Sequence, residues 1–376
     1  MTNILQTIAG ACKRCTRCTN ECAFLSEHGT PGSIAARYLS GSQTDTTLPF
    51  QCNLCGLCTS VCPQSLDPSA MFLVLRQQEF ARTLETLPNH SGILAYEQKG
   101  CSSLYSLYRF PRGCDTVFFP GCTFAGTRPG ITRRAYAFLQ DQIPGIGIIL
   151  DCCTKPSHDL GRTQFFTRTF DGLKEVLEAN NIHRVVTVCP SCHEIFKKHA
   201  PDIRAVTIYE ILSQSGPGQA FPSNKGIVTV HDPCVSRFDI PVQDAVRSLI
   251  RDMGFSIREM AHSRTSTVCC GEGGAACHVS PKFSNQWGLT RMEEAGRDPV
   301  ITYCAGCTST LGRNLQADHI LDHLFSQSRN DTLPFKVSRP PMTYANRLIL
   351  KQRLKKQPSD GVHIGQRHQT EKTTKK

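Results

Sequence analysis

The phrase VVTVCPSC at residues 185–192 returns as PVITYCAGC at residues 299–307, and both end in a C-x2-C pair. Two more phrases recur in the same order. DTVFFPGC (115–122) matches GIVTVHDPC (226–234), and IGIILDCCT (146–154) matches TSTVCCGEGG (265–274). Matching cysteines are 112 to 117 residues apart. A steady period of this kind indicates two copies of one folding unit.

Each repeat alternates between short apolar runs and helical patterns. The runs are bounded by Gly, Pro or charged residues, as buried strands are, and they cover residues 117–119, 146–150, 185–188, 227–230 and 300–303. Helices are predicted at 241–253, with Gly254 as a stop, and at 175–179. This alternation predicts mainly parallel sheets with right-handed crossovers. Ligands of such sheets lie at the carboxyl ends of strands, where most of the repeated cysteines fall.

Two groups of four cysteines stand near the N-terminus, each spaced C-x2-C-x2-C-x3-C. They are Cys12, Cys15, Cys18 and Cys22, then Cys52, Cys55, Cys58 and Cys62. Bacterial two-cluster ferredoxins have this spacing, and their fourth cysteine ligates the other cluster. We therefore expect one [4Fe–4S] cubane on Cys12, Cys15, Cys18 and Cys62, and a second on Cys52, Cys55, Cys58 and Cys22. A structural zinc pair normally uses two separate C-x2-C pairs, so zinc is disfavoured.

The repeated units each offer five cysteines, one more than a tetrahedral zinc site or an ordinary cubane needs. The first set is Cys122, Cys152, Cys153, Cys189 and Cys192, and the second is Cys234, Cys269, Cys270, Cys304 and Cys307. Adjacent thiolates suit a metal cluster in which one sulfur bridges two irons. The C-x2-C pairs also open predicted helices, whose N-termini favour thiolate. A twofold recurrence of five cysteines makes ordinary buried cysteine a poor explanation.

These observations divide the chain into an α+β protein of several parts. We expect a mainly α-helical two-cluster ferredoxin-type domain at residues 1–85, a connector at 86–113, two repeated α/β cysteine-rich half-domains at 114–220 and 221–330, and a basic, disordered tail at 331–376. One helix is predicted at 70–84 in the first domain, and a short one at 344–354 within the tail.

Composition and hydropathy indicate the cellular compartment of the protein. The 376 residues include 21 cysteines, and the chain starts without the segments of a secretory signal peptide. We therefore expect a reducing cytoplasm, where clustered cysteines bind metal or carry out redox work. No apolar run reaches the roughly 18–20 residues that span a bilayer, so membrane association is expected only through a partner subunit.

The net charge of +11 is concentrated in the tail, because residues 336–376 hold eleven Lys and Arg against Asp360 and Glu371. The rest of the chain is close to neutral, which argues against nucleic acid as a partner. A solubilising tail is the simpler interpretation, and contact with an acidic partner or an anionic membrane is the alternative.

The two ferredoxin-type groups followed by two C…CC…C-x2-C sets resemble the heterodisulfide reductase family. The likeness spans about residues 5–325 and is strongest to the form that fuses a ferredoxin-type subunit to the catalytic cysteine-rich subunit. Iron–sulfur subunits of glycolate oxidase, anaerobic glycerol-3-phosphate dehydrogenase and lactate-utilisation complexes are related. The resemblance implies that each five-cysteine set binds a noncubane [4Fe–4S] cluster and that the two clusters clamp and reduce a disulfide.

The first set departs from this pattern at one position. Thr154 follows its cysteine pair, where the family usually has Gly, whereas Gly271 follows the second pair. Glycine there permits a backbone conformation that a β-branched residue resists. All ten cysteines remain, so both sites are kept in the prediction.

Three functions compete. The first is an oxidoreductase subunit resembling heterodisulfide reductase, which passes electrons from a partner through two cubanes to noncubane clusters that reduce a disulfide-type substrate. The second is an electron relay of a flavin-linked 2-hydroxy-acid or glycerol-3-phosphate dehydrogenase that feeds quinone. The third, a zinc scaffold, is nearly excluded by the first eight cysteines. The expected partner is a flavoprotein or a membrane cytochrome or quinone-linked redox subunit, because no nucleotide-binding fingerprint occurs.

A few other residues lie near the cysteines in sequence. His158 and His278 are candidate proton donors, although a loop histidine without function is the simpler interpretation, and Lys155 and Glu272 could handle product protons. The leftover thiols Cys101, Cys114 and Cys277 are interpreted as buried cysteines.

Overall fold

The N-terminal region is built of helices joined by short loops. In the computed structural model, which describes residues 2–216, 224–326, 335, 337–357 and 363–365, these helices are α1 (Thr2–Ala11), α2 (Arg17–Glu21), α3 (Ala23–His28), α4 (Pro31–Leu39), α5 (Leu48–Gln51), α6 (Leu57–Ser60), α7 (Pro68–Thr83), η1 (Pro88–His90) and α8 (Ser91–Cys101). The helix predicted at 70–84 is α7. It starts where Asp67 accepts a hydrogen bond from the Ala70 amide and Pro68 occupies the first turn.

A six-stranded sheet follows, in the order β10-β1-β3-β2-β4-β5. Its strands are β1 (Leu107–Phe110), β2 (Thr116–Phe119), β3 (Gly147–Leu150), β4 (Arg184–Thr187), β5 (Arg204–Thr207) and β10 (His363–Gly365). Strands β2 to β5 are parallel, whereas β1 is antiparallel to β3 and β10. We call this sheet and its helices the first half-domain.

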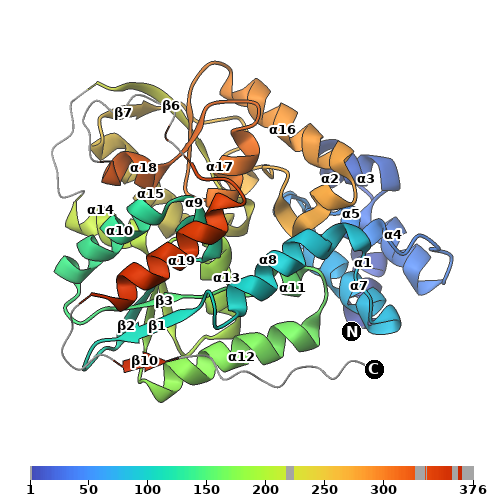
Figure 1. The fold of residues 1–376 in the computed structure, drawn as a ribbon. Coiled ribbons are helices and arrows are strands. Elements are labelled where there is room, and N and C mark those ends of the chain that lie inside the picture. The colour runs from blue at the N-terminus through green and yellow to red at the C-terminus, as the bar shows by residue number, and fades with distance from the viewer. Residues whose placement is uncertain (1, 217–223, 327–334, 336, 358–362, 366–376) are drawn as a thin grey trace.

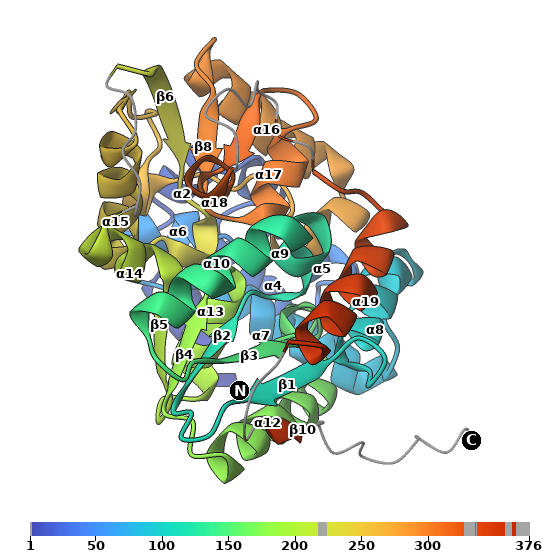
Figure 2. The same ribbon diagram turned by 60° about the vertical axis from the view of Figure 1, so that its left-hand side comes forward.

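Side chains alternate along each buried strand of this sheet, so both faces are covered. Val117, Phe119 and Ile149 pack against α12 (Thr163–Ala179), while Phe118 and Ile148 pack toward α10 (Pro129–Gln142). Figures 1 and 2 show α12 and α10 on opposite faces. The remaining helices of this half-domain are α9 (Cys122–Thr127), α11 (Lys155–Asp159), α13 (Pro190–His199) and α14 (Ile208–Ser215).

The second half-domain has a four-stranded parallel sheet in the order β7-β6-β8-β9. Its elements are β6 (Gly226–His231), η2 (Cys234–Ser236), α15 (Ile240–Asp252), β7 (Phe255–Ile257), η3 (Arg264–Ser266), η4 (Gly273–His278), α16 (Pro281–Ala295), β8 (Val300–Thr302), α17 (Ala305–Leu311), β9 (Ala317–His319) and α18 (Ile320–Phe325). The predicted mixture of helix and sheet is confirmed, and each of the five predicted runs coincides with a strand to within one or two residues. The helix expected at 175–179 is the end of the longer α12.

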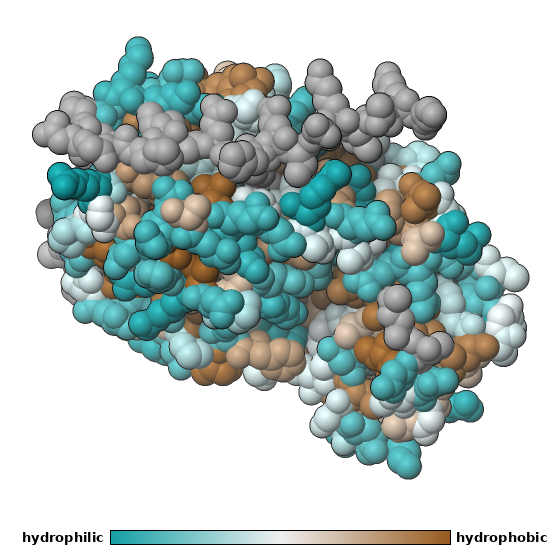
Figure 3. Space-filling model, turned by 90° about the horizontal axis from the view of Figure 1, so that it is seen from below, coloured by the Kyte–Doolittle hydropathy of each residue, from teal (hydrophilic) through white to brown (hydrophobic). Residues whose placement is uncertain are grey.

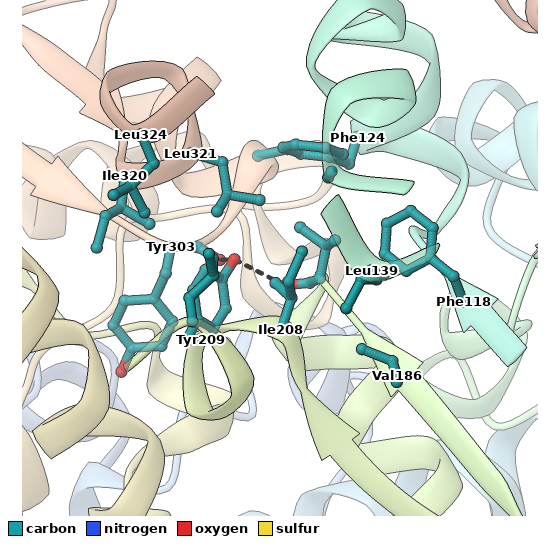
Figure 4. Packing of buried hydrophobic residues seen from close by; sticks show 14 of the residues in the cluster. Phe118, Phe124, Leu139, Val186, Ile208, Tyr209, Tyr303, Ile320, Leu321 and Leu324 are labelled. Atoms are coloured by element: carbon teal, nitrogen blue, oxygen red, sulfur yellow. Dashed lines mark hydrogen bonds between the residues drawn. The ribbon is translucent and has the colours of Figure 1, made fainter. Parts of the chain in front are cut away.

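The two sheets share one apolar core. Phe118 and Val186 of the first sheet belong to the same buried cluster as Tyr303 and Ile320 of the second half-domain. Figure 4 shows Tyr209 of α14 between them, and its hydroxyl lies 3.0 Å from the carbonyl oxygen of Tyr303. The half-domains are therefore packed against each other through side chains.

Two predicted boundaries need correction. β1 lies inside the range expected to be a connector, and β10 and α19 (Met342–Lys355) lie inside the range expected to be a disordered tail. Leu350 and Leu354 of α19 are buried in the shared core, so one apolar stripe outweighs the basic composition of the segment. The short helix predicted at 344–354 is confirmed, whereas residues 366–376 lie outside the described residues.

Seen from below, the described residues expose no large apolar band. Figure 3 shows this face as mostly hydrophilic, with small hydrophobic patches between polar side chains. Among the described residues, no helix combines the length and the apolar character needed to cross a membrane.

Candidate metal centres

The first two cysteine groups lie on loops with the same backbone shape. In the first loop Arg14 and Thr16 flank Cys15 with positive φ values of 53° and 63°, and in the second Leu54 and Gly56 flank Cys55 with 50° and 70°. Left-handed residues on both sides of the middle cysteine curl the chain so that successive thiols turn inward. The two loops therefore have the same local backbone shape, as expected if each holds an equivalent cluster.

The fourth cysteine of each group is exchanged. Burial, and then repulsion by Cys55 and Cys52, raises the pKa of Cys22, so this thiol lies among the second group. Burial and repulsion by neighbours that include Cys62 raise the pKa of Cys18 to about 11. Cys62 therefore lies with the first group, as the sequence spacing predicts.

The second five-cysteine set collects at the carboxyl ends of β6 and β8. Cys234 opens η2 after β6, Cys304 caps α17 after β8, and Cys307 lies in the first turn of α17. Thiol contacts connect all five: Cys234 with Cys269, Cys269 with Cys270, Cys270 with Cys307, and Cys307 with Cys304. Residues more than 70 positions apart in sequence thus form one sulfur cluster.

The first five-cysteine set has the same arrangement around β2, β3 and β4. The sulfur of Cys122 lies 3.9 Å from that of Cys152, and the sulfur of Cys192 lies 3.3 Å from that of Cys153. Cys189 caps α13 and contacts Cys192. All ten cysteines predicted for the two sets are therefore gathered into two groups.

Tyr209 bridges the two strands that carry part of each set. Its hydroxyl lies 2.9 Å from the Val188 carbonyl and 3.0 Å from the Tyr303 carbonyl, the residues directly before Cys189 and Cys304. One buried side chain thus holds the carboxyl ends of β4 and β8 together.

Each half-domain also places an ionisable side chain beside the cysteines of the other. Lys155 interacts electrostatically with Cys234, and Glu272 with Cys189. The ammonium of Lys155 lies 2.8 Å from Asp159 and 3.2 Å from Glu194. Although burial opposes it, these carboxylates hold the pKa of Lys155 above its usual value, so the ammonium stays charged beside the sulfur groups.

The helical domain docks on the second five-cysteine set. Asn53 donates to the carbonyls of Gly271 and Gly273 at 3.1 and 3.2 Å, and its own oxygen accepts from Trp287 at 3.1 Å. Arg237 donates to the Cys55 carbonyl at 3.0 Å. Burial and repulsion by Cys234 raise the pKa of Cys55, so the second cysteine group of the helical domain adjoins the second set.

The first five-cysteine set is covered by α8 and α19 instead. The guanidinium of Arg347, on a side chain only 2% exposed, interacts electrostatically with Cys122 and Cys152 and lies over the rings of Tyr96 and Tyr105. Tyr96 donates to the Cys122 carbonyl at 3.2 Å. Part of the predicted tail is therefore a wall of this site.

The residues after the two cysteine pairs both have a left-handed backbone, but only the first has room around it for a side chain. Thr154 has φ 57° and ψ 25°, and its hydroxyl donates to the Cys153 carbonyl. Gly271 has φ 106°, and a Cβ there would lie 2.7 Å from the Ser284 carbonyl oxygen. The first site has room for a side chain at this position, and the second does not.

The residues around the thiols fit iron–sulfur clusters. Soft thiolates grouped in fours and fives suit iron, and the Gly271 amide donates to the Cys269 sulfur at 3.3 Å. Two buried polar groups next to the five-cysteine sets, Nη1 of Arg347 and the ring nitrogens of His231, have no partner within the described protein. A sulfur-rich group held by the cysteines would supply those partners.

The charged and histidine candidates named from the sequence differ in whether they reach the cysteine sets. Lys155 and Glu272 reach the cysteine sets, whereas the His158 ring pairs with Asp159 and packs on Phe166. Cys114 is a buried thiol that donates to the Thr116 carbonyl, as interpreted from sequence, whereas Cys101 and Cys277 are only half-buried. The ring of His278 packs against His90.

Three residues beside the cysteine sets were not identified from sequence. Cys101 hydrogen-bonds Cys152, Arg347 comes from the supposed tail, and His231 lies beside Cys270 and Cys307. Of these three, only His231 could have been found from the sequence. It lies inside a repeated phrase, where it replaces the phenylalanine at position 119 of the first copy.

Comparisons with known proteins agree with this geometry. Residues 11–67 match the 4Fe-4S dicluster domain and residues 228–312 match the cysteine-rich domain. One subunit of the fumarate reductase (CoM/CoB) of Methanothermobacter marburgensis is 23% identical over 347 residues, which cover 83% of this chain and 69% of the relative.

Two further relatives carry related names. The probable iron-sulfur-binding oxidoreductase FadF of Bacillus subtilis is 25% identical over 160 residues, 39% of this chain and 22% of the relative. One subunit of the dihydromethanophenazine:CoB--CoM heterodisulfide reductase of Methanosarcina barkeri is 21% identical over 314 residues, 73% of this chain and 75% of the relative. The chain therefore carries a 4Fe-4S dicluster domain and a cysteine-rich domain, and it is related to the iron–sulfur oxidoreductase subunits of the heterodisulfide reductase group.

Proposed function

We propose that this chain takes electrons from a redox partner, conducts them through two cubane [4Fe–4S] centres, and reduces a disulfide-type substrate between two noncubane centres. The observation that carries the proposal is the pair of complete five-cysteine sets, whose strands Tyr209 bridges and which Cys55 approaches on one side. A relay needs one path for electrons, whereas two neighbouring sets are suited to the two sulfurs of one disulfide.

The proposed ligands follow the groups described above. The cubanes bind to Cys12, Cys15, Cys18 and Cys62, and to Cys52, Cys55, Cys58 and Cys22. The noncubane centres bind to Cys122, Cys152, Cys153, Cys189 and Cys192, and to Cys234, Cys269, Cys270, Cys304 and Cys307. When bound, these clusters supply one-electron carriers and iron–sulfur sites that can hold a thiolate.

The protein supplies charge and proton handling. Reduction of a disulfide breaks one S–S bond, consumes two electrons and two protons, and yields two thiols. The ammonium of Lys155, held in place by Asp159 and Glu194, stabilises the thiolate that forms beside Cys234. The carboxyl group of Glu272, next to Cys189, is the side chain that we propose carries a proton to the other sulfur.

The electrons must come from another protein. The likeness to subunits of multi-subunit redox complexes supports a redox partner, and we propose a flavoprotein or a membrane cytochrome or quinone-linked subunit. The second cubane group adjoins the second five-cysteine set, so electrons are expected to reach that set first.

Iron analysis and EPR spectroscopy of anaerobically purified protein test the proposal. Four clusters require about sixteen irons per chain, and the reduced protein should reduce a soluble aromatic disulfide to thiols with a viologen donor. About eight irons with cubane signals alone would contradict the noncubane assignment.

Single cysteine variants assign the signals. Cys153→Ala and Cys269→Ala should each abolish one noncubane signal and leave the cubane signals unchanged. Cys114→Ala is the matched control, because this buried thiol donates only to a backbone carbonyl. A chain with full iron that passes electrons but never cleaves a disulfide would favour the relay function.

A further inference from the structure

The second five-cysteine set has a buried histidine that the first set lacks. His231 ends β6, three residues before Cys234, and its side chain is fully buried. One ring nitrogen lies within 4.8 Å of the sulfurs of Cys270 and Cys307. Neither ring nitrogen has a hydrogen-bond partner within the described protein.

A buried imidazole without a hydrogen-bond partner is unfavourable, because its N–H group has given up water without replacement. Proteins satisfy most buried groups of this kind, so the position of His231 beside two thiols points to a partner at the sulfur cluster. In either protonation state the ring carries at least one N–H, which a sulfur acceptor at the cluster would satisfy.

The corresponding position of the first half-domain is apolar. Phe119 lies three residues before Cys122, and its ring packs edge-on against Phe196 at 5.2 Å. The two sets are thus alike in thiols but different in polar contacts.

We propose that His231 donates an N–H hydrogen bond to a sulfur of the centre held by the second five-cysteine set. This inference rests on the proposed function, since it requires a cluster there. The set already offers five thiols as ligands, so the histidine acts as a positioning residue that tunes the centre. Donation to sulfur stabilises the more negative, reduced state, so His231 should make the second centre easier to reduce.

Redox titration of His231→Phe, monitored by EPR, measures this contribution. The variant copies the residue of the first half-domain. We expect the reduction equilibrium of the second centre to shift about tenfold toward the oxidised state, which is about 59 mV for a one-electron couple. The reduction potential of the first centre should not change, and the iron content should stay at about sixteen per chain.

Two more variants keep the test sharp. His231→Gln retains an N–H donor and should recover part of the shift. His90→Phe is the control for loss of a buried imidazole, because His90 is also buried yet lies at Phe50 and His278. An unchanged potential in His231→Phe, or an equal shift in His90→Phe, would overturn the inference.

Pulsed EPR on protein with 15N-labelled histidine separates donation from ligation. Donation predicts weak 15N coupling that disappears in His231→Phe, whereas a strong coupling from a nitrogen bound to iron would refute it. Wild-type protein with only about eight irons would instead contradict the proposed function itself.

A separate observation concerns the outermost cysteine group. Cys15 is exposed, and Lys13, Arg14 and Arg17 beside it are exposed as well. The ion pairs found among the described residues involve none of these three cations. The most accessible thiol of the helical domain is therefore surrounded by unneutralised positive charge.

We infer that this collar, defined as Lys13, Arg14 and Arg17, docks an acidic one-electron carrier protein onto the first cubane. The inference rests on the proposed function, because it requires a cluster at Cys15. Opposite charges accelerate association, and salt weakens the effect. The collar is distinct from the C-terminal basic segment, which lies at the other end of the sequence.

Stopped-flow reduction by an acidic [2Fe–2S] ferredoxin tests the collar. The triple variant Lys13→Glu, Arg14→Glu and Arg17→Glu should react at least tenfold more slowly at low salt, while a neutral small-molecule reductant reduces both proteins equally. The matched control carries the same charge change at the exposed Arg251, Arg297 and Lys355. An equal loss in the control, or a wild-type rate independent of salt, would overturn the inference. A missing EPR signal from the first cubane would point to failure of the proposed function instead.

Discussion

The two half-domains hold the same five cysteines in the same order, yet different parts of the chain cover them. The first set lies under α8 and α19, with Arg347 beside Cys122 and Cys152. The second lies under the helical domain, with Asn53 and Arg237 making the contacts. Duplication thus explains the thiols, and the segments packed on each copy explain why the two sites are not equivalent.

We expect the largest effect from a change at the residue that follows the second cysteine pair. Gly271→Thr places in the second site the residue of the first. Its Cβ would meet the Ser284 carbonyl at 2.7 Å in a left-handed backbone, so we expect a loss of about 3 kcal/mol or more in the free energy of unfolding. Thermal unfolding and iron analysis should show lower stability and the loss of about four irons. Normal stability and iron would mean that the second loop adapts as the first has done.

Glu97 ties α8 to the first half-domain and makes its attachment depend on pH. The carboxyl accepts from the Ser157 amide at 2.8 Å, and burial raises its pKa to about 7. An acid with a raised folded-state pKa loses stability as pH rises from its unfolded value near 4.5 to about 7.

Glu97→Gln should remove this dependence. Between pH 4.5 and pH 8, the free energy of unfolding of the variant should rise by up to about 3 kcal/mol relative to that of the wild type. Denaturant titrations at several pH values measure the gain. Parallel curves for the two proteins would show that Glu97 is not the source of the dependence.

Arg347 distinguishes the first centre from the second by its charge. Arg347→Met removes a cation beside Cys122 and Cys152, so the first centre should become harder to reduce by roughly 50–100 mV. EPR-monitored titration should show no change at the second centre. Lys351→Met is the control, because Lys351 anchors the same helix to the Ser103 and Leu104 carbonyls. A similar shift in both variants would trace the effect to helix anchoring.

Thr154→Gly should have the smallest effect. It relieves a β-branched residue of a left-handed conformation but removes the hydroxyl contact to Cys153. These changes nearly cancel, so the free energy of unfolding should change by less than about 1 kcal/mol. Thermal unfolding and iron content check this, and loss of the first centre would show that Thr154 holds it.

Local patterns were sufficient for the secondary structure of the repeats. The strand runs carried their own boundaries, and α15 showed clear helical periodicity. α7 has a weaker apolar stripe, but Asp67 and Pro68 mark its start. β1 and β10 were missed because each is only a few residues long and gains its stability from a neighbouring strand. The packing of α19 was missed because its charge outweighed its stripe of leucines in the composition.

The sequence by itself determined which thiols belong together, because cysteine spacing and an in-order repeat report directly on the local loops that carry ligands. Only the tertiary structure decided what surrounds each set. Arg347, Cys101 and His231 reach the thiols from elements distant in sequence or through the orientation of a side chain. Such contacts arise from packing between segments, and no local pattern encodes them.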